Sequence, residues 1–337
     1  MLSFEEIKEA STSILELHPE APLMYTGAPG LGKTACALAV AKALGIPADR
    51  TSVIHLNDHD VIDFTGVPSI VDGMTIFNPS EMFYPFREGT GPGFVLLEEL
   101  AQTPVPIQTW TGGFVEERMF GKYKLDPEVR IICTGNRAQD RSGAKPLLAH
   151  LNDRMIHFDM VTSLDDWCAH AMSIGVNPWL IAFLRLRPDL LNNFEPSQRS
   201  NGTQRSWVKV DKLIPMTLPT NQYLAACSGK VGEANAAEWV AAKDMMHKMP
   251  SIDAIRLHPD TMEIPTEPAV KFAVSTSMSM TATAECFGRD MVYIDRMPKE
   301  FQMVYVTDVL RLNPALQATP DFIAWAIANK DIFLGSN

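Results

Sequence analysis

Gly27-Ala28-Pro29-Gly30-Leu31-Gly32-Lys33-Thr34 is the stretch that decides the fold. It matches the pattern G-x-x-x-x-G-K-S/T, in which a glycine-rich loop wraps around phosphate groups. Such a loop needs a strand before it and a helix after it. Residues 22–26 are mainly apolar and short enough for a buried strand, and residues 35–44 are rich in Ala and Leu. The sequence therefore predicts a strand–loop–helix unit that binds phosphate.

The residue types in this loop fit phosphate chemistry. Glycine lets the backbone turn tightly, so that successive N–H groups converge on phosphate oxygens, and the start of the helix adds partial positive charge. Lys33 supplies a mobile cation for the outer phosphates, and the Thr34 hydroxyl can ligate Mg²⁺. The alternative interpretation is a chance glycine-rich turn. Because the flanking strand and helix favour the functional interpretation, we predict a nucleotide site formed by Gly27, Pro29, Gly30, Leu31, Gly32, Lys33, Thr34 and Ala35.

Length and composition bound the class of protein. The chain has 337 residues, enough for about two domains, a mean hydropathy of −0.02 and no apolar run long enough to span a membrane. The first residues are polar and acidic, unlike a signal peptide. Five dispersed cysteines without a CxxC pair predict neither a disulfide framework nor a zinc site, so we expect a reducing, cytoplasmic location. The net charge of −11 argues against a broad contact with duplex DNA.

The first half of the chain predicts an α/β fold with a parallel sheet. Helical patterns at residues 1–20, 35–44, 104–113 and 144–151 alternate with the strand before the loop and with further apolar strands. Alternation of this kind is typical of parallel sheets. The further predicted strands are residues 51–56, 94–99, 129–136 and 155–159.

Polar side chains end two of these strands. Glu98 and Glu99 follow four apolar residues, and Asn136 follows another buried strand. Acidic residues at a strand's carboxyl end, after a phosphate-binding loop, fit the metal and water positions of an enzyme that hydrolyses nucleoside triphosphates. The alternatives are an acidic surface turn and a turn-forming asparagine, and the loop upstream favours the catalytic interpretation.

Two hairpins and a helical second half complete the prediction. Residues 67–77 alternate around Asp72-Gly73, and residues 114–125 form a second hairpin across Gly121. After Ser163 the pattern is helical, with four prolines in a predicted linker at 248–268 and breaks at Pro298 and near 314–320. The predicted helices of the middle part are 164–173, 177–186, 205–215, 219–229 and 233–247. The predicted domains are an ATPase core at 1–162, a helical lid at 163–248, and a linker with a helical region at 249–337.

The order of these segments resembles the AAA+ ATPases, and within them the MoxR-type branch of bacteria and bacteriophages. The motifs cover about residues 1–245, whereas the remainder is similar only in its helical pattern. The resemblance implies a five-stranded parallel sheet with helices on both faces, two inserted β-hairpins, an all-α lid and a C-terminal helical extension. Residues 63–68 and the hairpin after them resemble the insert of that branch, and the hairpin across Gly121 resembles the one before sensor 1.

The resemblance also implies roles for single residues. Residues 27–34 resemble Walker A, and residues 94–99 resemble Walker B. Walker B usually ends in Asp-Glu, and this chain departs from that pattern with Glu98-Glu99. Glu98 would then face the metal together with Thr34, and Glu99 would polarise the attacking water. Because Glu98 is one methylene longer than Asp, the geometry at the metal is in question.

Three further residues correspond to AAA+ catalytic positions. Asn136 resembles sensor 1, Arg154 within residues 151–155 resembles the arginine finger, and Arg205 within residues 203–207 resembles sensor 2 on the lid. Arg154 could instead be a surface arginine, and Arg205 could simply cap a lid helix. The predicted catalytic set is Glu99, Asn136, Arg154 and Arg205.

The function implied by the resemblance is Mg²⁺-dependent ATP hydrolysis in an oligomeric ring, expected to be a hexamer, coupled to remodelling or maturation of a protein partner. That partner could be a von Willebrand factor A-domain protein. The alternatives are a nucleic-acid motor, a nucleotide-gated scaffold with little turnover and, least favoured, a small-molecule kinase. His55 and His59 are four residues apart, but no Glu follows in HExxH position, so a metal site there is not expected.

Overall fold

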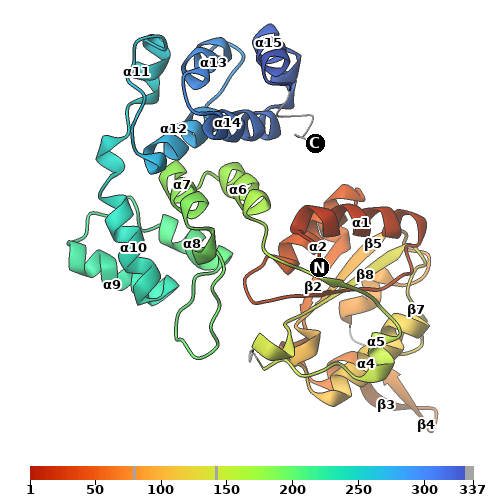
Figure 1. The fold of residues 1–337 in the computed structure, drawn as a ribbon. Coiled ribbons are helices and arrows are strands. Elements are labelled where there is room, and N and C mark those ends of the chain that lie inside the picture. The colour runs from red at the N-terminus through yellow and green to blue at the C-terminus, as the bar shows by residue number, and fades with distance from the viewer. Residues whose placement is uncertain (79–80, 141–142, 331–337) are drawn as a thin grey trace. The chain divides into compact units, whose positions relative to one another are not determined.

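The computed structural model describes residues 1–78, 81–140 and 143–330 (Figure 1). The chain divides into two compact units. The first unit comprises residues 1–163 with 194–197, and the second comprises residues 164–193 with the chain from 198 onward. No helix within the described ranges is long and apolar enough to cross a membrane.

The first unit is built on a five-stranded parallel sheet, as predicted. Its strands are β1 (Leu23–Thr26), β2 (Thr51–His55), β5 (Gly93–Glu98), β8 (Val129–Gly135) and β9 (Ile156–Asp159). Their order across the sheet is β2-β5-β8-β1-β9, and every neighbouring pair is parallel. Parallel strands place all their carboxyl ends at one edge, so the segments that follow β1, β2, β5 and β8 meet there.

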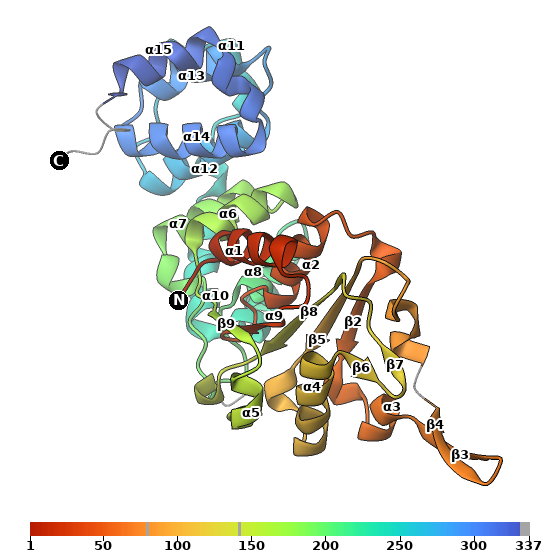
Figure 2. The ribbon, with the colours of Figure 1, turned by 90° about the vertical axis from the view of Figure 1, so that its right-hand side faces the viewer.

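Helices cover both faces of this sheet (Figure 2). Successive side chains of a strand point to opposite faces. Leu96 of β5 packs with α1 (Phe4–Leu17) and α2 (Lys33–Ala43), whereas Leu97 packs with α4 (Val105–Glu117) on the other face. The second face also contains α3 (Val61–Thr65) and α5 (Ala149–Asn152), whose Phe64 and Leu151 belong to the same buried cluster. Two buried clusters therefore hold the sheet between them.

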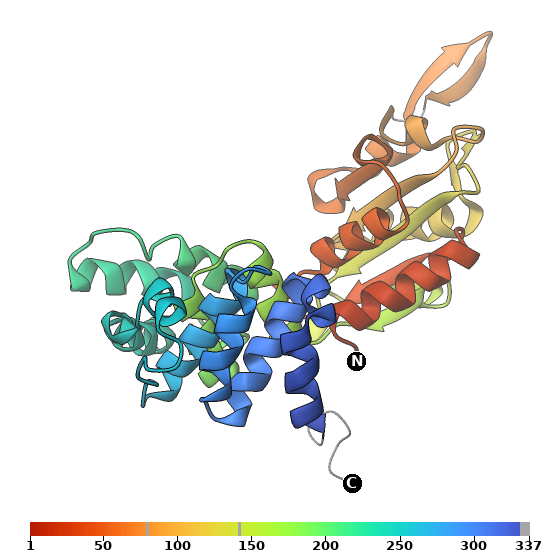
Figure 3. The same cartoon turned by 90° about the horizontal axis from the view of Figure 1, so that it is seen from above.

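Both predicted hairpins are present. β3 (Val67–Val71) pairs antiparallel with β4 (Met74–Asn78) around Asp72 and Gly73, which both have positive φ. This hairpin projects away from the sheet (Figures 2 and 3). The second hairpin is shorter than predicted, with β6 (Met119–Phe120) paired to β7 (Tyr123–Lys124). Residues 114–117 belong to α4 instead, because Phe114 and Val115 are buried on the core side of that helix.

The prediction of a helix at residues 144–151 is wrong about where the helix starts. Only Ala149–Asn152 is helical. Pro146 explains the difference, because a proline disfavours helical backbone at the residue before it. Short 3-10 turns of the first unit are Ala48–Arg50, Leu56–Asp58, Glu81–Phe86, Leu100–Gln102 and Ala138–Asp140.

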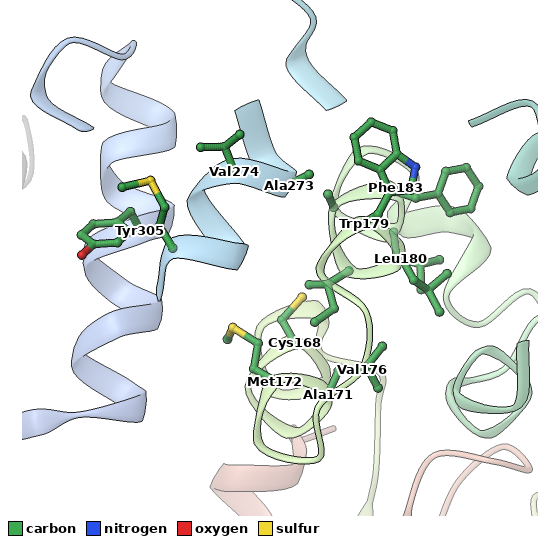
Figure 4. Close-up of a cluster of buried hydrophobic side chains, with 14 of the residues drawn as sticks. Cys168, Ala171, Met172, Val176, Trp179, Leu180, Phe183, Ala273, Val274 and Tyr305 are labelled. Atoms are coloured by element: carbon green, nitrogen blue, oxygen red, sulfur yellow. The ribbon is translucent and has the colours of Figure 1, made fainter. Parts of the chain in front are cut away.

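The second unit is helical throughout its described part and packs around one buried apolar cluster. The cluster includes residues from Trp167 to Trp325. Figure 4 shows part of it, with Cys168 of α6, Trp179 of α7 and Tyr305 of α14. The helices are α6 (Leu164–Ser173), α7 (Pro178–Leu186), α8 (Gln204–Asp211), α9 (Thr220–Val231), α10 (Glu233–Lys243), α11 (Ile252–Leu257), α12 (Pro268–Met280), α13 (Phe287–Asp295), α14 (Lys299–Leu312) and α15 (Pro320–Ala328), with 3-10 turns at Pro188–Leu190, Met246–Lys248 and Pro314–Ala318.

The segment predicted as a proline-rich linker contains α11. Its Ile255 is fully buried, and its Arg256 donates to Asp290 of α13. The helical breaks at Pro298 and near residues 314–320 are confirmed. The predicted separation of a lid at 163–248 from a C-terminal region stays a prediction.

Candidate active site

The phosphate-binding loop joins β1 to α2, as predicted. Gly30 and Gly32 have φ values of 81° and 84°, in the left-handed region that residues with a side chain rarely adopt. Gly27 is needed for a different reason, because a Cβ there would lie 3.0 Å from the carbonyl oxygen of Met160. Gly32 precedes Lys33, the first residue of α2, and so leaves the start of the helix without a side-chain cap. The loop therefore presents backbone N–H groups at a helix N-terminus, an arrangement suited to phosphate.

Lys33 connects this loop to the predicted sensor 1 residue. Its Nζ donates to the carbonyl oxygens of Gly27 and Ala28, at 2.9 and 3.0 Å, and to Oδ1 of Asn136 at 2.8 Å. Asn136 follows β8, the strand next to β1 in the sheet. The structure thus brings together two residues that are 103 positions apart in the chain.

Thr34 and Glu98 also meet at this edge of the sheet. The Thr34 hydroxyl donates a hydrogen bond to Oε1 of Glu98, whose side chain is 8% exposed. A hydroxyl and a carboxylate beside a phosphate-binding loop are the hard oxygen donors that Mg²⁺ takes in nucleotide sites, where substrate phosphates and water complete its shell. Their donor chemistry fits Mg²⁺. Within residues 1–78, 81–140 and 143–330 no group of three or more His, Cys, Asp and Glu side chains could hold a metal ion, so the fit depends on those external ligands.

Glu99 lies directly after β5 in an uncommon backbone conformation. Its φ is 64°, and such strain at a non-glycine residue costs about 1–3 kcal/mol and is often found at functional sites. The Glu99 side chain is exposed, and its Oε2 accepts a hydrogen bond of 2.8 Å from Nδ2 of Asn57. Its backbone N–H points to Oγ1 of Thr134, 3.4 Å away. The carboxylate is therefore presented to solvent and tethered at one oxygen.

Sequence reasoning missed Asn57 and gave His55 no role beyond the metal site that was not expected. His55 ends β2, and Asn57 lies in the 3-10 turn that follows; Nδ1 of His55 is 3.0 Å from Oε2 of Glu98. Nothing in the sequence around them indicates a role. The contact of His55 with Glu98 follows from the pairing of β2 with β5, which places the two residues opposite each other.

Pro29, Leu31 and Ala35 complete the predicted loop residues. Leu31 is buried, Pro29 is half-buried and Ala35 is exposed in the first turn of α2. The predicted positions Gly27 to Ala35 thus form one continuous turn into the helix.

Each of the two predicted arginines has its own local surroundings. Nε of Arg154 is 3.5 Å from Oε2 of Glu116 on α4, and its side chain is 33% exposed. Arg205 belongs to the second unit, where it is exposed in the first turn of α8. The roles of Arg154 as arginine finger and of Arg205 as sensor 2 stay predictions.

No family model and no curated protein sequence matches this chain. NtrX from Brucella abortus is 16% identical with a TM-score of 0.42, over 99% of this chain and 68% of that chain. A DNA polymerase III gamma subunit-related protein from Thermotoga maritima is 14% identical with a TM-score of 0.41, over 90% and 99%. PCH-2 from C. elegans is 13% identical with a TM-score of 0.33, over 73% and 69%. Likeness of this extent says nothing about function. The parallel sheet, the loop and α2 themselves define this chain as a P-loop α/β protein.

Proposed function

We propose that this chain is a Mg²⁺-dependent ATPase of the AAA+ type, related to the MoxR branch. The observation that supports it best is the meeting of Lys33, Thr34, Glu98, Glu99 and Asn136 at the carboxyl edge of one parallel sheet. Lys33 and Thr34 are residue types that ATP hydrolysis uses at the phosphates and the metal, and Glu98 supplies a carboxylate where Asp is usual. Adenine as the base is an expectation from the resemblance alone.

Each residue of this site has a separate role in phosphoryl transfer, which enzymes catalyse mainly by positioning and charge. The loop N–H groups and Lys33 hold the phosphates. Glu99 orients the water whose oxygen bonds to the γ-phosphorus as the bond to the β–γ bridging oxygen breaks, giving ADP and phosphate. Asn136, already held against Lys33, helps to hold that water. Thr34 and Glu98 would hold Mg²⁺, which when bound neutralises charge on the phosphates.

Arg154 provides the reason to propose a ring. Its side chain is partly exposed and pairs with Glu116 rather than with the Lys33 cluster. We infer that it reaches the γ-phosphate held by a neighbouring copy, so that no single chain completes its own site. A hexamer and a protein client, with a von Willebrand factor A-domain protein as one candidate, follow from the resemblance.

The test is the ATPase rate against protein concentration, for wild type mixed with increasing amounts of Arg154→Ala. We expect the specific rate to rise with concentration and to fall faster than the wild-type fraction, since trans arginines contribute about 10³–10⁵ in rate. Glu116→Ala, which removes only the ion-pair partner, is the matched control and should keep its activity. A rate proportional to the wild-type fraction would mean that each chain acts alone.

A nucleotide-gated scaffold with little turnover is the second candidate. It is favoured by Glu98 in place of the usual Asp and by the bond between Glu98 and Thr34, which occupies the proposed metal ligands with each other. In that case the chain would bind ATP, and its slow hydrolysis would be the same in wild type and Glu99→Gln. Stimulation of hydrolysis by DNA would instead favour a nucleic-acid motor.

A further inference from the structure

We propose that His55 is a positioning residue that acts through Glu98. Its imidazole lies against one carboxylate oxygen, so that the other stays at the Thr34 hydroxyl, where Mg²⁺ with nucleotide would bind. This inference rests on the proposed function, because it concerns the affinity of the same site for Mg²⁺.

The sheet itself creates the contact. His55 is the last residue of β2, Glu98 is the last residue of β5, and the two are directly paired in the parallel register. Neighbouring strands lie about 4.8 Å apart, so paired side chains on one face of the sheet are in reach of each other. The distance from Nδ1 of His55 to Oε2 of Glu98 is 3.0 Å, so the imidazole and the carboxylate are in direct polar contact.

Elementary chemistry says which way a hydrogen bond across this contact would run. An ionised carboxylate only accepts hydrogen bonds, so Nδ1 of His55 would have to carry the proton. A neutral imidazole protonated at Nδ1 is sufficient, and Nε2 is then left as an acceptor. Imidazole N–H groups that hold a metal-binding carboxylate in this way belong to the outer shell that tunes metal affinity.

The longer side chain at position 98 explains why a restraining contact is useful there. Glu has one more rotatable bond than Asp, so more rotamer freedom must be lost to hold its carboxylate at the metal position. The side chain is 8% exposed, and a buried carboxylate is costly unless donors face it. Thr34 donates to Oε1, and Nδ1 of His55 lies 3.0 Å from Oε2, so each carboxylate oxygen faces a polar partner. His55 thereby offers a physical account of how Glu98 can stand in place of Asp.

The experiment measures binding of a fluorescent ATP analogue to the full chain, first in EDTA and then during a Mg²⁺ titration. For His55→Ala we expect the half-saturating Mg²⁺ concentration to rise about tenfold, as for other outer-shell partners, with the affinity in EDTA unchanged. His55→Asn keeps an N–H donor near the place of Nδ1 and should stay within about threefold of wild type. His18→Ala is the control, because His18 also faces a carboxylate, Glu20 at 3.7 Å, but at the end of α1.

A second background tests the route through Glu98. The shorter side chain of Glu98→Asp is drawn back from His55, so His55→Ala should have no further effect on Mg²⁺ dependence in that background. An unchanged or lower half-saturating Mg²⁺ concentration in His55→Ala overturns the proposal. The proposal also fails if His55→Ala raises this concentration as much in the Glu98→Asp background as in wild type. A lower concentration would mean that the contact competes with the metal.

One outcome would count against the proposed function instead. If wild type binds no nucleotide at any Mg²⁺ concentration, the ATPase proposal fails, and the contact is then tested alone by ¹⁵N NMR of the imidazoles. Wild type should show His55 protonated at Nδ1, and Glu98→Ala should lose this tautomer. An identical tautomer in both proteins would overturn the role of His55.

Discussion

The two units use polar side chains in opposite ways. At the sheet edge of the first unit, two polar groups remain accessible: Glu99 is exposed, and the side chain of His55 is 55% exposed. In the second unit, two ion pairs are buried. Arg256 forms two hydrogen bonds to Asp290, whose side chain is 0% exposed, and Arg185 pairs with Asp308, whose side chain is 2% exposed.

The buried pairs connect helices that are distant in sequence. Asp290 of α13 accepts from Arg256 of α11 and from the hydroxyl of Tyr305 on α14, while Arg256 also donates to the carbonyl of Met278 on α12. Burial and the adjacent Asp290 carboxylate raise the pKa of Tyr305 above its ordinary value, so it stays a neutral donor. Every group in this network is committed to another part of the same unit. We infer that the second unit uses charge to fix helix positions, whereas the first unit keeps charge available for a ligand.

The largest expected effect lies in the second unit. Asp290→Ala leaves Arg256 buried without its partner, and breaking a buried pair in this way costs about 3–5 kcal/mol. The measurement is the free energy of unfolding in urea, followed for the transition of the second unit. Asp295→Ala on the same helix is the matched control, because its contact with Lys299 is 3.7 Å long and exposed and should be worth about 1 kcal/mol or less. Equal costs for the two variants would remove the distinction between the units.

The next effect lies in the first unit and concerns rate rather than stability. Glu99→Gln keeps the size of the side chain and removes the carboxylate that we propose orients water, so ATP hydrolysis should fall by about 100-fold or more. Nucleotide affinity and the free energy of unfolding should not change, because Glu99 is exposed. Steady-state hydrolysis, nucleotide binding and urea unfolding are measured on the same preparation. A loss of stability like that of Asp290→Ala would show that Glu99 has a structural role.

The same contrast explains what could be predicted from sequence. The phosphate-binding loop, the five strands and the polar residues that end them are local patterns. The structure confirms the strand–loop–helix unit and the sheet, and it places Lys33 in contact with Asn136. His55 and Asn57 could not be found in this way, because their partners are set by the pairing of β2 with β5. That pairing joins residues about forty positions apart and depends on the whole sheet.

The second unit shows the same limit more strongly. Four prolines near α11 favoured a linker, yet Ile255 and Arg256 hold this helix in the core of the unit. The contribution of Arg256 to stability depends on Asp290, 34 residues later. Neither residue differs in sequence context from a surface residue. Propensity and spacing describe the local chain, whereas burial is decided by packing between distant helices.

A smaller effect sharpens the comparison within the active site. Asn57→Ala removes the hydrogen bond to Oε2 of Glu99, and a bond to a charged group is worth about 1.5–3 kcal/mol. Since the contact is exposed, we expect the lower end of that range, about a tenfold fall in hydrolysis, with nucleotide binding unchanged. Asn57→Asp, which faces Glu99 with a second carboxylate, should slow hydrolysis further. A faster rate in Asn57→Ala would mean that the contact holds Glu99 away from the water.

The smallest effect is expected in the β3–β4 hairpin, where apolar rather than polar groups are accessible. Ile70 is 80% exposed and Met74 is 64% exposed, so neither buries much area that could stabilise the fold. Ile70→Ser should therefore change the free energy of unfolding by about 0.5 kcal/mol or less and leave basal hydrolysis unaltered. Phe64→Ala is the control from the helix just before the hairpin: Phe64 is fully buried and stacks on Trp110 at 4.5 Å, so its loss should cost about 3–5 kcal/mol. If Ile70→Ser destabilised the chain as much as Phe64→Ala, the hairpin would be part of the stabilising core. The exposed groups of the first unit would then contribute to its stability as its buried groups do.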